Sequence, residues 1–474
     1  MSQRKTRLAA KAALFVSILI LTAATLAQTS APATKSTRTP RMTKKDVDPA
    51  IAAALKNVSA AHIKATIEKL VSFHNRNTIS SNDAELLAKG RGVVAARDWI
   101  KSEFERYSKS CGGCLEVKLD TFTEPAANRI PKPTEISNVY AVLRGTSEQS
   151  PQPIYVVTGH YDSRNSDTLN ITDPAPGAND DASGTAVSLE CARVLSQQKF
   201  PSTIIFLTVA GEEQGLNGAR HFAKMAKTEG WNISGVLNND IVGGNKSKDQ
   251  DPAIVRVFSE GIPQAATEAE LRTIRNLALE NDSPSRQLAR YARETGAKYV
   301  AAPFQAKMIF RRDRFLRGGD HTAFNENGFA AIRFTEYRED FNRQHQNPRT
   351  ENGIEYGDLP KFVDFEYVAN VARINVATLA SLASAPAPPS NVKVLTKKLD
   401  NDTDLTWEAS ADGRAVKYEV VWRPTTASEW ENAEALGNVT SANFKRSKDN
   451  VIFGVRSVDK KGNRSVVVLP TPER

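Results

Sequence analysis

Hydrophobic positions recur with two different periods along the chain. In residues 49–73 and 90–108 they recur every three or four positions, which predicts helices. From about residue 138, short runs rich in β-branched residues alternate with runs of helical spacing. This alternation predicts crossover connections and a mostly parallel sheet covered by helices, so the expected fold class is α/β.

The predicted strands of this sheet are short and apolar. They read NVYAVLRG, IYVVTGH, TIIFLTVAG and ISGVLNND, and they begin at residues 138, 154, 203 and 233. Two segments between them, GTAVSLECARVLSQQ and GARHFAKMAKTEG, have helical spacing. Sites in such sheets form at the carboxyl ends of the strands, and polar side chains gather there in this chain.

The pattern changes again near the C-terminus. Proline and small residues predict a linker over 384–390, and short alternating strands with turn signals predict a β-sandwich over 391–474. This segment resembles a fibronectin type III domain: Trp407 matches the early core tryptophan, whereas Phe453 or a neighbour replaces the late tyrosine. We expect it to contact a surface, a matrix or a polymeric substrate, or to act as a spacer.

The first 27 residues differ from the rest of the chain. Four basic residues precede the apolar run AALFVSILILTAATLA, which predicts a secretory signal with Ala27 as the last residue before cleavage. An uncleaved anchor is the alternative. We therefore expect a secreted or periplasmic protein that makes no membrane contact after cleavage, with a basic Ser/Thr/Pro-rich tail over 28–48.

Net charge does not indicate a nucleic-acid partner. The formal charge is +9, and removal of the four basic residues in the first 27 leaves +5. The clustered basic run TKSTRTPRMTKK has no interleaved aromatic residues, so it reads as a solvated tail.

The three cysteines fit an exported protein. Cys111 and Cys114, in SCGGCLE, predict a local disulfide in an oxidising compartment. Cys191 lies in a helical pattern and is expected in the core.

Histidine, aspartate and glutamate occur at four successive strand–helix junctions: TGHYDS, GANDDASG, AGEEQG and LNNDIVGG. One such junction means little, but four with a later histidine form a set of metal ligands. The set lacks cysteine, which indicates zinc or a similar divalent ion. Because the carboxylates are too many for one zinc, a pair of metals bridged by a carboxylate and a hydroxide is expected.

Together with RGGDHTAF and QHQNPRTENG, these motifs resemble the zinc-dependent exopeptidases that include the secreted bacterial leucine aminopeptidases, plasma glutamate carboxypeptidase and the glutaminyl cyclases. The resemblance covers residues 49–383. It implies a mixed sheet between helices, two zinc ions per chain, and removal of N-terminal residues from peptides or proteins with a free N-terminus.

The resemblance also implies five metal ligands: His160, Asp180, Glu213, Asp240 and His345. Asp180 would bridge the two zincs, with Asp181 as the alternative. Asp162 would orient His160. Glu212 would be the general base: it would accept a proton from the water that becomes the metal-bridging hydroxide and return this proton to the leaving amine. Neighbours at a strand end point in different directions, so the adjacent glutamates need not share a partner.

His321 competes with His345 for the last ligand position. The order of motifs in the family favours His345 and places Asp320 and His321 at the wall of the cleft. Arg317 lies near the same wall in the sequence and is a candidate contact to a peptide carbonyl.

Residue 344 departs from several relatives, which carry a tyrosine there to stabilise the oxyanion. It is Gln in this chain. Tyr337, Gln344, His321 or Arg317 could substitute, or the metals could act alone.

Two other functions use the same scaffold. One is a different reaction, such as carboxypeptidase, dipeptidase or one-zinc glutaminyl cyclase activity. The other is a non-enzymatic binding protein, which predicts that ligands are lost; none of the five is lost here.

Overall fold

The computed structural model describes residues 47–148 and 152–474. The predicted signal segment and nearly all of the basic tail lie outside these residues. Within the described part, no helix combines the length and hydropathy needed to cross a membrane.

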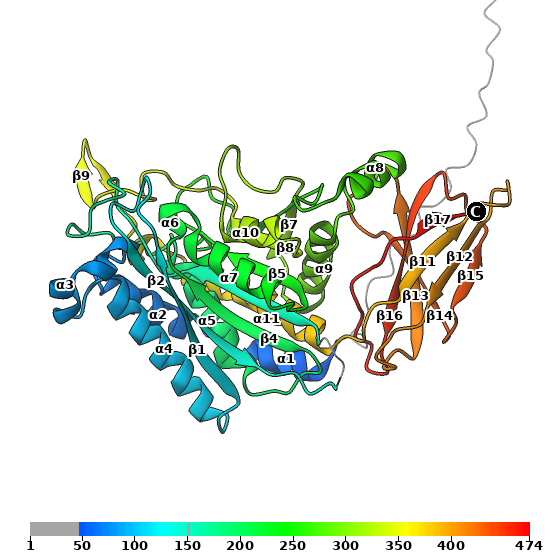
Figure 1. The fold of residues 1–474 in the computed structure, drawn as a ribbon, viewed down its shortest axis with the longest axis horizontal. Helices are drawn as coiled ribbons and strands as arrows, with labels where there is room; N and C mark the ends of the chain where they lie inside the picture. Colours follow the sequence, from blue (N-terminus) through cyan, green and yellow to red (C-terminus); the bar gives the residue numbers. More distant parts are fainter. Residues whose placement is uncertain (1–46, 149–151) are drawn as a thin grey trace, which may run out of the picture. The chain divides into compact units, whose positions relative to one another are not determined.

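A mixed eight-stranded sheet organises the α/β part (Figure 1). Its strands are β1 (Leu115–Glu124), β2 (Thr134–Leu143), β3 (Ile154–His160), β4 (Thr203–Val209), β5 (Ile233–Asn239), β6 (Ile254–Ser259), β7 (Gln305–Ile309) and β8 (Ala331–Glu336). They lie in the order β1-β2-β4-β3-β5-β8-β6-β7. The central strands β4, β3, β5 and β8 run parallel, whereas β1, β2 and β6 introduce antiparallel pairs. The predicted α/β fold with a mixed sheet is confirmed.

Helices cover both faces of this sheet. The helices of this part are α1 (Pro49–Lys56), α2 (Ala60–Val71), α3 (Ala84–Ala88), α4 (Gly92–Ser110), α5 (Ala182–Leu195), α6 (Glu212–Gly215), α7 (Asn217–Thr228), α8 (Glu268–Leu277), α9 (Pro284–Tyr299), α10 (Asp320–Glu326) and α11 (Phe365–Ser384). All except α3, α6 and α8 contribute buried side chains to the cores on the two faces. Alternate residues of β4 enter two cores: Ile204 and Phe206 pack in the core that contains α2, α5 and α11, and Ile205 and Leu207 pack with α7 and α10. Burial on both faces explains why the middle of β4, residues 204–207, is an unbroken apolar run.

Two details differ from the sequence prediction. The helical pattern over 49–73 is two helices. The first, α1, ends at Lys56, and Ser59 caps the start of α2, where its hydroxyl accepts a hydrogen bond from the His62 amide at 3.2 Å. Strands β1, β6 and β7 escaped prediction; β1 and β7 form the two edges of the sheet, and solvent-exposed residues interrupt both.

The C-terminal part is all-β, as predicted. Its strands are β11 (Ser390–Leu395), β12 (Thr403–Glu408), β13 (Lys417–Pro424), β14 (Asn432–Leu436), β15 (Ser441–Phe444), β16 (Val451–Val458) and β17 (Thr471–Glu473). They form a four-stranded and a three-stranded sheet, and Trp407 and Phe453 are buried in the core that both contribute to. Membership of the fibronectin type III family stays a prediction.

The cysteines lie as the sequence suggests. Cys111 and Cys114 form a disulfide just after α4, and Cys191 is buried in α5. A short hairpin of β9 (Arg349–Glu351) and β10 (Ile354–Tyr356) follows the central strands.

Arg76 joins two loops at the carboxyl ends of the central strands. It is fully buried, and its guanidinium donates to four backbone carbonyls: Tyr161 at 2.7 Å, Leu70 at 3.0 Å, Pro176 at 2.7 Å and Gly177 at 2.9 Å. Burial lowers the pKa of Arg76 to about 10, although nearby aspartates oppose this, so the side chain stays cationic at neutral pH. One side chain therefore ties the turn after β3 to the loop before α5.

We expect Arg76→Met to lower the free energy of unfolding by about 3 kcal/mol or more, because it leaves buried carbonyls without donors and removes the cation that attracts nearby aspartates. Urea denaturation measures the change. Arg144→Met is the matched control, since Arg144 is exposed and pairs only with Glu116; it should change the free energy by less than about 1 kcal/mol. Equal effects of the two variants would contradict this structural role.

Candidate metal centre

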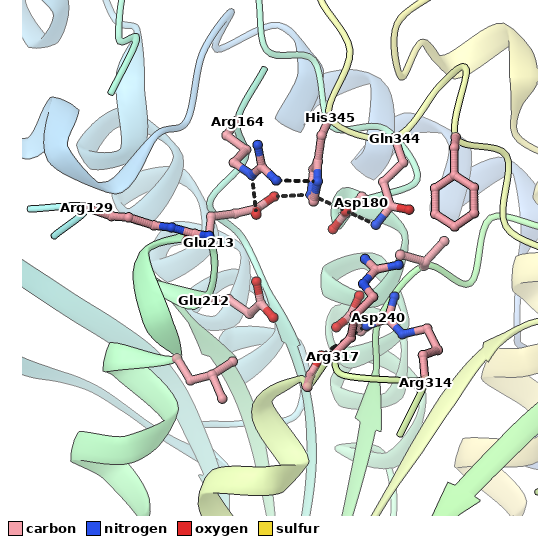
Figure 2. A pocket seen from close by; sticks show the side chains of 14 residues that line it. Arg129, Arg164, Asp180, Glu212, Glu213, Asp240, Arg314, Arg317, Gln344 and His345 are labelled. Atoms are coloured by element: carbon pink, nitrogen blue, oxygen red, sulfur yellow. Dashed lines mark hydrogen bonds and ion pairs between the residues drawn. The ribbon is translucent and has the colours of Figure 1, made fainter. Parts of the chain in front are cut away.

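A cavity of about 550 Å³ opens where the parallel strands β3, β4, β5 and β8 end (Figure 2). It is lined by Arg129, Arg164, Asp180, Glu212, Glu213, Leu216, Asp240, Ile241, Arg314, Arg317, Gly318, Phe341, Gln344 and His345. Four of the five predicted metal ligands are in this lining. The fifth, His160, is the last residue of β3 and is fully buried.

The five predicted ligands form two groups that share one residue. His160, Asp180 and Asp240 make the first group, and Asp180, Glu213 and His345 make the second; within each group the ligand atoms lie within 4.8 Å of one another. Asp180 belongs to both. Such sharing is what a carboxylate that bridges two metal ions requires.

The two carboxylate oxygens of Asp180 point to different histidines. Its Oδ1 lies 3.1 Å from His160 Nε2, and its Oδ2 lies 2.9 Å from His345 Nε2. Asp240 Oδ1 completes the first group at 3.9 Å from His160 Nε2, and Glu213 Oε1 completes the second at 2.9 Å from His345 Nε2. The geometry therefore separates two possible ion positions on either side of one aspartate.

The donor atoms fit a metal better than they fit hydrogen bonding. His160 Nε2, His345 Nε2 and Glu213 Oε1 are buried, and their close polar contacts, such as the 2.9 Å between the last two atoms, lack hydrogen-bond geometry. Buried polar atoms of this kind are rare and call for a partner. Imidazole and carboxylate ligands without cysteine suit zinc.

The electrostatic field of the cluster favours cations. Burial alone would lower the pKa of His345, but Glu213 and Asp180 outweigh it and raise the pKa to about 10. Burial also opposes protonation of His160, yet Glu212 and Asp181 hold its pKa well above the usual value. Burial first, and then Asp240 and Glu213, raise the pKa of Glu212. Bound cations would relieve this concentration of negative charge.

Asp162 lies where the sequence predicted it. Its backbone carbonyl is 3.2 Å and its Oδ1 3.4 Å from His160 Nδ1, on the side of the ring away from the other ligands. Its Oδ2 accepts hydrogen bonds from Thr78 Oγ1 at 3.0 Å and from the Glu213 amide at 3.2 Å. Asp162 thus orients a ligand of each group.

The neighbouring aspartates have separate tasks. The Asp181 carboxylate accepts backbone hydrogen bonds from His160 at 3.0 Å, Gly184 at 2.9 Å and Ile241 at 3.2 Å, and it caps α5. These bonds occupy Asp181, whereas Asp180 faces both histidines. The Asp180 amide in turn donates to Asp358 Oδ2 at 2.7 Å.

The adjacent glutamates also diverge (Figure 2). Gly211 has φ of 81°, and the chain turns there into the short helix α6. Glu213 is 4% exposed and lies between His345 and Arg164, whose Nε donates to Glu213 Oε2 at 2.9 Å. Glu212 is 15% exposed and faces the cavity, with its Oε2 4.0 Å from His160 Nε2.

The other predicted site residues are distributed unevenly. Arg317 lines the cavity. His321 and Asp320 are fully buried, and neither is in the cavity lining. His321 Nε2 contacts the Arg312 carbonyl at 2.8 Å, and burial lowers the pKa of His321 to about 4, so its imidazole is neutral. Gln344 donates to Asp180 Oδ2 at 2.9 Å.

Sequence reasoning missed three arginines of the cavity: Arg129, Arg164 and Arg314. Arg164 is two residues after Asp162 and directly follows the motif TGHYDS, so its position in the sequence could have indicated that it lies in the cavity. Arg129 comes from the loop between β1 and β2, where no pattern indicated a site.

Comparisons with known proteins identify the family of this chain. The family model described as Peptidase family M28 matches residues 138–365. A probable zinc metalloprotease of Leptosphaeria maculans is 48% identical over 89% of this chain and 97% of its own length, and one of Pyrenophora teres f. teres is 46% identical over 90% and 87%.

A solved structure supports the fold. The crystal structure of LapA from Legionella pneumophila covers 70% of this chain and 76% of its own, with a TM-score of 0.50 and 21% sequence identity. The curated relatives match the chain over nearly their whole length at far higher identity. This chain therefore belongs to peptidase family M28.

Proposed function

We propose that this chain is an exported exopeptidase that uses two zinc ions to remove N-terminal residues from peptides or proteins. The observation that carries the proposal is the pair of ligand groups sharing Asp180, beside a carboxylate, Glu212, that belongs to neither. Membership of family M28 and the titles of the relatives, probable zinc metalloproteases, support zinc-dependent peptide hydrolysis. The sequence resemblance to leucine aminopeptidases supports the N-terminal specificity.

The two groups would each hold one ion: His160, Asp180 and Asp240 the first, and Asp180, Glu213 and His345 the second. Zinc bound there supplies Lewis acidity, which lowers the pKa of a water molecule and polarises a carbonyl. The chain contributes fixed ligand positions, since Asp162 and Asp358 hold the ligand-bearing segments through backbone hydrogen bonds.

Glu212 has the position of a general base. Among the described residues, its carboxylate takes part in no hydrogen bond, and it faces the cavity near His160. A base so placed accepts the proton of the attacking water and returns it to the amine that leaves. Glu213 is unsuited to this task because Arg164 and His345 engage both of its oxygens.

Export is supported by two features. The first 27 residues have the pattern of a secretory signal. The Cys111–Cys114 disulfide suits an oxidising compartment. The C-terminal β-rich part would then contact a surface or matrix outside the cell, or act as a spacer.

We expect Glu212→Gln to keep its zinc and to lose at least about 100-fold in kcat on leucine p-nitroanilide, because the amide cannot accept a proton. Elemental analysis and steady-state kinetics measure the two quantities. Glu229→Gln, which changes an exposed glutamate beyond α7, is the control and should leave both unchanged. Full turnover by Glu212→Gln would rule out Glu212 as the base.

The metal content should follow the two ligand groups. Purified protein should hold about two zinc ions per chain, and Glu213→Gln or His345→Ala should lower this towards one. Asp180→Asn should weaken both sites because it serves both groups. His221→Asn is the control, since His221 stacks on Phe122 outside the cavity. Elemental analysis that finds no loss in the ligand variants would refute the assignment.

Blocking the N-terminus of the substrate distinguishes aminopeptidase activity from carboxypeptidase and glutaminyl cyclase activity. A peptide with a free N-terminus should be cleaved residue by residue from that end, and its N-acetylated form should resist cleavage. Mass spectrometry of the products shows which end shortens. Cleavage of the acetylated peptide from its C-terminus would instead establish a carboxypeptidase, and loss of ammonia from N-terminal glutamine a cyclase.

A further inference from the structure

Four arginines line the cavity, and they differ in what they contact. Arg164 is bound to Glu213 and His345, both predicted ligands. Arg314 and Arg317 share Glu339, each at 2.9 Å from its Oε2. Arg129 contacts none of these carboxylates.

Arg129 is held by a backbone group and keeps most of its donors available. Its Nη1 donates to the Glu213 carbonyl at 2.8 Å, which fixes the guanidinium beside the ligand segment (Figure 2). Across residues 47–148 and 152–474, no acidic side chain forms an ion pair with it. A guanidinium carries five N–H donors in a planar fork that matches a carboxylate.

The opposite wall of the cavity also carries excess positive charge. Glu339 accepts from three arginines, since Arg256 Nη2 lies 3.2 Å from its Oε1 in addition to Arg314 and Arg317. Burial opposes ionisation of Glu339, but these cations hold its pKa below the usual value. Asp313 also pairs with Arg314 at 2.9 Å, so two negative charges stand against three positive ones. Arg317 is the most exposed of the three, at 34%.

The balance of charges in the cavity shows which charge a substrate would meet. The cavity lining has four arginines and four carboxylates, Asp180, Glu212, Glu213 and Asp240. All four carboxylates have tasks in the proposed reaction, and the +4 charge of two divalent ions would balance their −4, which leaves the arginines in excess. On the proposed function, the loaded cleft is therefore positive, with Arg129 as a fixed, unpaired cation at its edge.

We propose that the cleft selects peptides that carry a carboxylate within a residue or two of the scissile bond, and that Arg129 binds this carboxylate. The group comes either from an acidic side chain or from the free C-terminus of a dipeptide or tripeptide. Arg317 adds to the attraction from the opposite wall. The inference rests on the proposed exopeptidase function and specifies its substrate class.

Matched peptide pairs test the selection and identify the source of the carboxylate. Leu-Ala is compared with Leu-Ala-amide, Leu-Glu-amide with Leu-Gln-amide, and an N-terminal Asp peptide with its Asn counterpart. In each pair only the charge differs. We expect kcat/KM to favour the charged member of at least one pair by about tenfold, the size of one charge-assisted hydrogen-bonded contact.

Arg129→Met should abolish that preference, and Arg129→Lys should keep part of it, because lysine retains the charge without the fork. The ratio within a pair is insensitive to the amount of active enzyme, so a variant with weakened zinc binding still gives a valid answer. Arg144→Met, which removes an exposed arginine remote from the cavity, should leave the ratio unchanged. Raising the salt concentration should lower the ratio in the unmodified protein, since an exposed charge is screened.

Three outcomes decide the matter. A ratio near one in every pair would overturn the inference while leaving the exopeptidase function intact. A preference that persists in Arg129→Met would overturn the role of Arg129. If zinc-loaded protein cleaves no peptide of the panel, the proposed function itself fails.

Discussion

Repulsion among carboxylates gathered at the ends of neighbouring strands is the constraint to which the rest of the site responds. Asp180, Glu212, Glu213 and Asp240 share one cavity, and buried carboxylates resist ionisation unless cations or donors oppose them. Two of them are paired with arginines. Arg333, fully buried, pairs with Asp240 at 2.9 Å, and Arg164 pairs with Glu213. What these leave uncompensated is the charge that two metal ions would neutralise.

The same constraint explains the doubled acidic pairs. Asp181 is held by backbone amides and caps a helix, so its neighbour Asp180 is the one left to face the histidines. Glu213 is enclosed by cationic groups, and Glu212 reaches the open cavity. In each pair, one residue is fixed in the structure and its partner points to a different environment. The two residues of each acidic pair are thus close together but have different roles.

Much of this arrangement was predictable, for a physical reason. In the sequence, a strand end is recognised where an apolar run stops. Neighbouring parallel strands bring their carboxyl ends together. For this reason the residues from His160 to Asp240 could be assigned to one site from the sequence alone. His345 required the order of motifs in the resembling family, because a loop and not a strand end delivers it. The family and the mixed sheet follow from the same motifs, and the comparisons confirm both.

Long-range contacts were not predictable. Arg129 and Arg314 reach the cavity from loops whose course no periodicity reveals, and Arg76 joins two loops about 100 residues away in sequence. His321 and Asp320 stand in a motif that suggested the cleft wall, yet the short helix α10 buries both side chains. Burial of a polar residue depends on what packs over it, and that information is not local.

Arg129 has a different origin in the fold from the candidate metal ligands, and this has an evolutionary consequence. Arg129 comes from the loop between β1 and β2, at the antiparallel edge of the sheet, whereas the candidate metal ligands follow the parallel strands at its centre. Mutation of an edge loop leaves the central strand junctions undisturbed. Substitutions in this loop can therefore change the charge at the edge of the cavity while the candidate metal ligands at its centre are retained.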